Sequence, residues 1–170
     1  LDTVPAIHNE IEASRQPLKG HIRFEKVDFV YPNTGIQAVR DFSLVIKPGE
    51  KIAIVGRTGS GKTTLAQLLL RMYDVTGGQI QMDGVDIRKL NLTTLREQIS
   101  YVPQDVFLFS ETVEKNIGFG LTAFDRTQVE LAAGRASVDK EIEGFSARYE
   151  TMIGERGVTL SGGQKQRISI

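Results

Sequence analysis

The chain has 170 residues, and its 21 Lys and Arg residues balance 21 Asp and Glu residues to a formal net charge of zero. This length has room for about one domain, and the balanced charge argues against a protein that binds nucleic acid through its phosphates. With 40% hydrophobic residues, no cysteine and no apolar run near the roughly 18 residues of a membrane span, the sequence indicates a folded domain without disulfides, which we expect to be soluble.

The N-terminal part of the chain alternates between apolar and polar residues after a short polar lead. Residues 1–20 show little periodicity and indicate a linker. Residues 22–31 and 42–46 alternate with a period of two, which predicts two β-strands, the first of them bulged or broken at Glu25. Turn residues at 32–35 and 47–50 follow the two strands and close the pair.

The next segment has the order strand, glycine loop, helix. Residues 51–55 (KIAIV) are apolar without alternation, which is typical of a strand that is covered on both faces of a parallel sheet. Residues 56–61 are rich in glycine, and leucines at helical spacing predict a helix over 62–72.

The remaining elements are short. A tight Asp-Gly turn predicts a β-hairpin over 79–87, and the residues that follow predict alternating helices and a strand. We expect Ser110 and Ser137 to act as helix N-caps. The expected elements are helices over 92–98, after Ser110, over 127–136, over 138–145 and after Ser161, and a strand over 99–102. Early antiparallel strands followed by this alternation indicate a mixed α/β domain.

The glycine-rich segment carries the strongest chemical signal. Gly56 to Thr63 (GRTGSGKT) matches the G-x-x-x-x-G-K-[ST] phosphate loop, between a predicted strand and a predicted helix. Backbone N–H groups of such a loop and the positive end of the helix surround the β-phosphate. Lys62 adds a positive charge for the β- and γ-phosphates, and the Thr63 hydroxyl is a ligand for Mg²⁺. The sequence therefore predicts that the chain binds a nucleoside triphosphate.

Three further sites are weaker signals, each with a structural alternative. Tyr31 ends a strand and either stacks on a base or is an edge aromatic residue. Gln104 follows a predicted strand and either contacts Mg²⁺ and orients a water or simply faces solvent. Ser161, Gly162 and Gly163 precede a helix and form either a second anion site or a turn with Ser161 as its N-cap.

Together, GRTGSGKT and the later LSGGQ resemble the nucleotide-binding domain of ATP-binding cassette (ABC) transporters. FVYP (29–32) is similar to the adenine-stacking A-loop of that family, and YVPQD (101–105) is similar to its Q-loop. GERG (154–157) resembles the exporter X-loop, and LFSETVEKNIGFG (108–120) resembles the exporter helical subdomain. The resemblance is strongest to the multidrug and lipid exporters.

The resemblance implies the fold and the site. The fold would be α/β, a P-loop NTPase core with an antiparallel β-subdomain and an α-helical subdomain, in which 1–20 link to a transmembrane domain and 21–170 form the nucleotide-binding domain. ATP and Mg²⁺ would be the ligands, with the metal at Thr63 and Gln104. Catalytic roles would fall to Lys62, Gln104 and, across a head-to-tail dimer, Ser161. Nucleotide contacts would come from Tyr31, Gly56, Arg57, Thr58, Gly59, Ser60, Gly61, Lys62, Thr63, Thr64, Gln104, Ser161, Gly162, Gly163 and Gln164.

The resemblance also implies partners and a location: a second nucleotide-binding domain and a transmembrane domain, at the cytoplasmic face of a membrane, with no nucleic acid. The family carries an apolar strand with a catalytic Glu, and a switch histidine, after LSGGQ, whereas this sequence stops at Ile170. We therefore expect a fold that is incomplete at its C-terminus, an apolar edge at KIAIV and little ATP turnover by these residues alone. His8 and His21 precede the phosphate loop and are given no role.

Two alternatives remain from the sequence. One is an ABC-type ATPase of DNA repair or chromosome structure, which the zero net charge and GERG disfavour. The other is an unrelated P-loop GTPase or kinase, although the guanine-reading N-K-x-D tetrapeptide of GTPases does not occur in the sequence.

Overall fold

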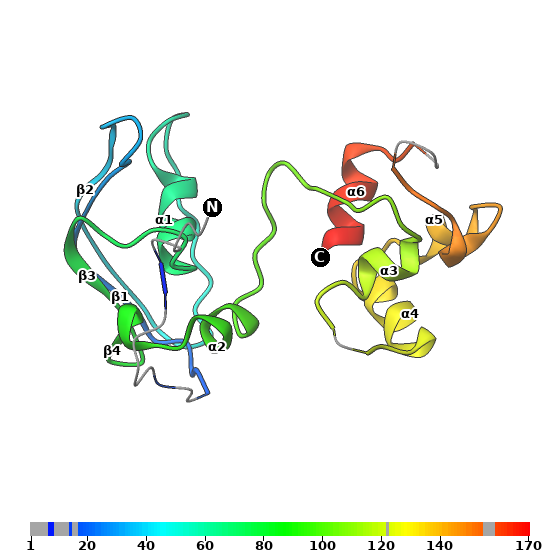
Figure 1. Cartoon of the computed structure of the whole chain (residues 1–170), viewed down its shortest axis with the longest axis horizontal. Coiled ribbons are helices and arrows are strands. Elements are labelled where there is room, and N and C mark those ends of the chain that lie inside the picture. Colours follow the sequence, from blue (N-terminus) through cyan, green and yellow to red (C-terminus); the bar gives the residue numbers. More distant parts are fainter. Residues whose placement is uncertain (1–6, 9–13, 15–16, 122, 155–158) are drawn as a thin grey trace, which may run out of the picture. The chain divides into compact units, whose positions relative to one another are not determined.

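The protein folds into two compact units, Leu1–Ile99 and Ser100–Ile170, seen in the computed structural model of Figure 1. The structure describes residues 7–8, 14, 17–121, 123–154 and 159–170. Strands β1 to β4 and helices α1 and α2 belong to the first unit, and helices α3 to α6 belong to the second. None of the helices within these residues is long and apolar enough to cross a membrane.

The first unit is built on a four-stranded antiparallel sheet in the order β2-β1-β3-β4. Its strands are β1 (Ile22–Val30), β2 (Gln37–Ile46), β3 (Gly77–Met82) and β4 (Val85–Asp86). The register of β1 shifts after Phe24, where Lys26 has a φ of 45°. The bulge expected from the sequence in this strand is therefore confirmed.

Two helices pack with this sheet around one core. They are α1 (Lys62–Leu69) and α2 (Leu92–Glu97), and a single 3₁₀ turn (Ile87–Lys89) leads from β4 toward α2. Apolar side chains of the sheet and of both helices are buried together, which gives the unit its hydrophobic stabilisation. The core residues are Phe24, Val27, Phe29, Val39, Leu65, Leu68, Ile80, Met82, Ile87, Leu90 and Leu95.

The residues before β1 are held to the β3–β4 turn by Asp83. Its carboxylate accepts the backbone N–H groups of Lys19 (2.6 Å) and His21 (2.9 Å). Desolvation favours the neutral carboxyl, but the backbone hydrogen bonds from His21, Lys19 and Gly20 outweigh it and hold the pKa of Asp83 below its ordinary value. The charged form of Asp83 therefore fixes the entry of the chain into the sheet.

The second unit is helical, with α3 (Val113–Ile117), α4 (Arg126–Arg135), α5 (Asp139–Glu143) and α6 (Gly162–Ser169), and a 3₁₀ turn over Arg148–Glu150. An antiparallel bridge joins Thr112 to Met152. The core of this unit consists of Val113, Val129, Ala133, Val138, Ile142, Tyr149, Ile153, Leu160 and Ile168.

Two strands expected from the sequence are wrong. Residues 51–55 and 99–102 are not strands in the structure. Ile54 is 45% exposed and Val55 is 93% exposed, so KIAIV is not covered on both faces. A parallel strand exists only through ladder hydrogen bonds to neighbours, and no strand within the described residues pairs with KIAIV.

Both expected serine caps are also wrong. Helix α3 begins later than Ser110, because residues up to Thr112 lie against 151–153, and Thr112 accepts the Lys115 N–H (3.2 Å) as the N-cap. Ser137 instead ends α4. The Ser137 N–H bonds to the Gly134 carbonyl and the Val138 N–H bonds to the Ala133 carbonyl, with Ser137 at a φ of 56°. This is the Schellman arrangement of a helix C-terminus, so Ser137 is not available to cap α5.

Candidate nucleotide-binding site

The phosphate loop enters α1 through two glycines in the left-handed region. Gly59 has a φ of 79° and Gly61, the N-cap of α1, has a φ of 83°. A Cβ on Gly61 would lie 2.3 Å from the Ala38 carbonyl oxygen. Glycine at 61 is therefore required twice, by the backbone conformation and by the close approach of strand β2.

Lys62 folds over the loop that precedes it. Its ammonium donates to the carbonyl oxygens of Gly56 (2.7 Å) and Arg57 (2.8 Å). The first hydrogen bond of the helix runs from the Leu65 N–H to the Gly61 carbonyl, which leaves the N–H groups of Lys62, Thr63 and Thr64 without an acceptor inside the helix. A charged ammonium and a helix N-terminus thus converge at one exposed loop, an arrangement that binds phosphate.

The two threonines after Lys62 face different surroundings. Thr63 is exposed at the start of α1, where its hydroxyl is accessible to a metal ion that prefers oxygen ligands. Thr64 is buried, at 5% exposure, and its hydroxyl lies 2.9 Å from the Tyr31 hydroxyl. The side chain of Thr64 therefore faces the protein interior, although the resemblance implied a nucleotide contact for this residue.

Tyr31 lies directly after β1, and its side chain contacts both aromatic neighbours and helix α1. The ring packs edge-on against Phe29 (centroids 4.9 Å apart) and against Tyr73 (5.5 Å). Its hydroxyl lies within hydrogen-bond distance of Thr64 and of Gln67 Oε1 (3.2 Å), both on α1. The ring is half-buried, so the structure ties the candidate base-stacking residue to the helix that follows the phosphate loop.

Ser161 is the N-cap of α6, in the second unit. Its hydroxyl accepts the Gln164 N–H (3.2 Å), and the Gln164 side chain accepts the Ser161 N–H (2.8 Å), which completes a capping box. Because the Ser161 oxygen accepts, its own hydrogen remains available to a ligand. Ser161, Gly162 and Gly163 are all exposed. The N-cap interpretation and the anion-site interpretation are therefore compatible at this serine.

Gln104 is exposed near the same helix. It lines a shallow hollow together with Asp105, Gly162 and Lys165. Its amide oxygen is a hard ligand of the kind that Mg²⁺ accepts. No group of three or more His, Cys, Asp or Glu residues that could hold a metal ion occurs in the described part of the chain.

The structure thus divides the predicted site residues between two units. Tyr31 and residues 56–64 lie in the first unit, and Gln104 and residues 161–164 lie in the second. Within each unit the predicted residues are neighbours, through α1 in the first and through the N-terminus of α6 in the second. Residues 155–157 of GERG fall outside the described residues.

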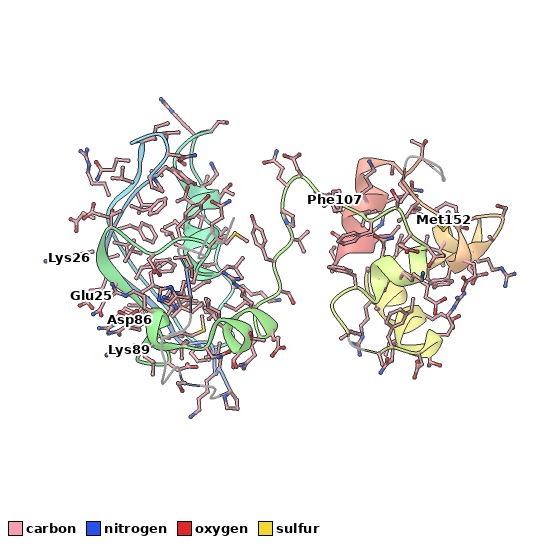
Figure 2. All side chains as sticks on the ribbon, in the orientation of Figure 1. Glu25, Lys26, Asp86, Lys89, Phe107 and Met152 are labelled. Carbon is pink, nitrogen blue, oxygen red and sulfur yellow. The ribbon has the colours of Figure 1, made fainter. Side chains whose placement is uncertain are left out.

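An exposed aromatic cluster was missed in the sequence. Phe107, Phe109 and Phe119 are 75%, 39% and 67% exposed, and neighbouring ring centroids lie 5.1 Å and 4.2 Å apart. Phe107 is labelled in Figure 2. The buried amide of Asn116 anchors the segment, because it accepts the Phe109 N–H (2.8 Å) and donates to the Phe109 carbonyl (3.1 Å). Three phenylalanines around a short helix were the only signal available in the sequence.

The glycine loop, the lysine folded over it and the helix behind it define a P-loop nucleotide-binding protein. The family described as ABC transporter matches residues 39–170. The chain belongs to the ABC transporter family.

Relatives of known name extend this assignment. The chain is 48% identical over 152 residues to the mitochondrial iron-sulfur clusters transporter ATM1 of Gibberella zeae. This match covers 89% of this chain and 22% of that protein. It is also 46% identical over 154 residues to the ATP-dependent lipid A-core flippase of Sodalis glossinidius. That match covers 90% of this chain and 26% of the flippase. The chain therefore spans about a quarter of the length of these relatives.

A solved structure of a bacterial Atm1-family ABC exporter with ATP bound is similar to this structure, with a TM-score of 0.92 at 36% identity over 99% of this chain and 30% of that one. The expected ABC ATPase fold is therefore confirmed, and ATP binding follows from the family. Nothing in these matches supports the DNA-repair alternative.

Proposed function

We propose that residues 21–170 are the nucleotide-binding domain of an ABC exporter and that residues 1–20 link it to a transmembrane domain. The relatives named above are transporters and flippases, and the chain matches only 22% and 26% of their lengths. We place the domain at the cytoplasmic face of a membrane, where it binds MgATP and uses its hydrolysis to drive export.

One observation carries the nucleotide-binding half of the proposal. The Lys62 ammonium lies against the carbonyls of its own glycine loop, at the N-terminus of α1. In a complex, phosphate oxygens of the triphosphate would replace these carbonyls as acceptors of the Lys62 ammonium. The same phosphates would also accept the loop N–H groups and lie at the positive end of the helix. Residues 56–63 and the backbone N–H of Thr64 would surround the phosphates, and Tyr31 would stack on adenine.

Mg²⁺ would be held by the Thr63 hydroxyl and the Gln104 amide, together with phosphate oxygens. Bound there, the ion would neutralise phosphate charge during transfer. Gln104 is neutral and cannot accept a proton from water at pH 7. We therefore expect hydrolysis to require a general base other than Gln104.

The second unit supplies the half of the site that acts across a dimer. The N-terminus of α6 presents exposed Ser161, Gly162 and Gly163, with the Ser161 hydrogen available to donate. In a head-to-tail pair, these groups and Gln164 would meet the γ-phosphate bound by the partner domain. Loss of that phosphate on hydrolysis would release the pair, so that one phosphate biases a two-state switch.

The aromatic cluster of Phe107, Phe109 and Phe119 supports the proposed link to a membrane domain. Exposed aromatic side chains gathered on one surface are typical of a protein interface. Phe107 follows YVPQD, and Phe109 and Phe119 belong to LFSETVEKNIGFG, the segments that resemble the Q-loop and the exporter helical subdomain.

The test is MgATP binding and phosphate release by the purified full-length protein and its Lys62→Ala variant. We expect the variant to lose about 1.5–3 kcal/mol of binding free energy, because it lacks a charge-assisted contact. Lys47→Ala is the matched control, since it removes an exposed lysine of the same unit. Unchanged affinity in Lys62→Ala would contradict the proposed site.

A further inference from the structure

Two side chains of α1 hold the tip of the Tyr31 ring. The Tyr31 oxygen lies 2.9 Å from Thr64 Oγ1, and the Tyr31 hydroxyl donates to Gln67 Oε1 at 3.2 Å. A phenol has one hydrogen, and Gln67 Oε1 is only an acceptor, so the Thr64 hydroxyl is the donor to Tyr31. The hydrogen bonds therefore run in one direction, from Thr64 through Tyr31 to Gln67.

The body of the same ring is held by aromatic neighbours. Phe29 and Tyr73 meet it nearly at right angles, at 78° and 86°. Thr64 and Gln67 are three residues apart and so lie on one face of α1. A ring that is fixed at both its body and its tip has little freedom left to lose when a flat ligand stacks on it.

We propose that Gln67 is a positioning residue for base recognition, which acts by holding the Tyr31 ring in place for stacking. This inference rests on the proposed function, because it assumes that Tyr31 stacks on the base. Gln67 has no part in the contacts of Lys62 with the phosphate loop. Its loss should therefore weaken binding through the base and leave binding through the phosphates unchanged.

The experiment compares two ligands, MgATP and magnesium tripolyphosphate, which carries the phosphates without a base. Their dissociation constants are measured on the full-length protein, and the readout is the preference for ATP over tripolyphosphate. We expect Gln67→Leu to reduce this preference by about threefold to tenfold, the effect of one hydrogen bond. Gln67→Glu keeps an acceptor for the Tyr31 hydroxyl and should retain the preference that Gln67→Leu loses.

Two further variants complete the design. Gln79→Leu is the matched control, because Gln79 lies on β3 and its side-chain amide donates to Glu25 Oε2 (2.7 Å) rather than to Tyr31. Tyr31→Phe keeps the ring and removes only the hydroxyl, so it should reduce the preference as Gln67→Leu does. It also replaces Gln67→Leu if that variant does not fold.

The outcomes separate this inference from the proposed function. An unchanged preference in Gln67→Leu or Tyr31→Phe, alongside a reduced one in Tyr31→Ala, overturns the positioning role and leaves the stacking role intact. Equal weakening of both ligands in Gln67→Leu overturns it too, because that result indicates general damage to the unit. An unchanged preference in Tyr31→Ala contradicts base stacking itself.

Discussion

Gly61→Ala is expected to damage both the stability of the first unit and its affinity for ATP. The residue has a φ of 83°, and an alanine in the left-handed region costs roughly 1–2 kcal/mol. The new Cβ would lie 2.3 Å from the Ala38 carbonyl oxygen, well inside the 3.4 Å at which ordinary contact begins. The obstructing atom belongs to the backbone of β2 and cannot rotate away, so overpacking adds roughly another 1–3 kcal/mol.

The summed penalty of about 2–5 kcal/mol corresponds to a fall of roughly 10 °C or more in the unfolding temperature of a unit of this size. Thermal unfolding and calorimetry with MgATP, both on the full-length protein, measure the two effects. Gly59→Ala separates the conformational penalty from the steric clash. Gly59 has a φ of 79° but open space around it, so alanine there should carry only the conformational cost.

Gly134→Ala is the control of opposite sign. Gly134 lies inside α4, with nothing within 4 Å of an added Cβ, and alanine there should stabilise the helix by about 0.5–1 kcal/mol. If Gly61→Ala unfolded at the wild-type temperature and bound MgATP with wild-type affinity, the loop would not lie against β2, and the reasoning would be wrong.

Three further variants probe other contacts. Tyr31→Ala should cost about 1–3 kcal/mol of MgATP binding by calorimetry. Tyr31→Phe should also weaken binding, because it removes the hydroxyl contacts with Thr64 and Gln67. Asn116→Ala leaves backbone groups of Phe109 and Thr112 without their partner and should destabilise the second unit by about 2–4 kcal/mol in urea. The pKa of Asp83 is lowered in the folded state, so its contribution to the free energy of unfolding is complete above the ordinary carboxyl pKa of about 4. This contribution is lost as the pH falls through the lowered pKa. Asp83→Asn should abolish this part of the acid dependence of stability, measured by urea titrations from pH 6 to 3.

The sequence predicted the elements whose signals are local. The phosphate loop, α1 and the cap at Ser161 depend on glycines, leucine spacing and a serine within a few residues, and all are present. The strand predicted at KIAIV was wrong because an apolar run indicates burial, and burial depends on neighbours far along the chain rather than on the segment itself. The N-cap predicted at Ser137 was wrong because a serine between two helices suits either the end of one or the start of the next. The Schellman hydrogen bonds place Ser137 at the end of α4.

The contacts of Tyr31 were beyond prediction for a related reason. An aromatic residue beside a turn is visible in the sequence, but Gln67 lies 36 positions away, and only the packing of β1 against α1 brings them together. The same holds for Asn116, whose amide contacts a segment that carries no pattern of its own.

Ser161 combines two roles that one substitution can separate. Its oxygen caps α6 by accepting the Gln164 N–H, and its hydrogen is available for a γ-phosphate across the proposed dimer. Ser161→Ala removes both roles, and loss of the cap alone costs about 0.5–2 kcal/mol. Ser161→Asp retains a good cap but replaces the donor with a carboxylate, which repels phosphate.

We therefore expect Ser161→Asp to unfold at or near the wild-type temperature while losing MgATP-dependent association of the nucleotide-binding domains. Ser161→Ala should be impaired in both measurements. Analytical ultracentrifugation with and without MgATP, beside thermal unfolding, distinguishes the two variants in the full-length protein. Wild-type association of Ser161→Asp would mean that the serine acts only as a helix cap, because no carboxylate could replace a hydroxyl donor against a triphosphate.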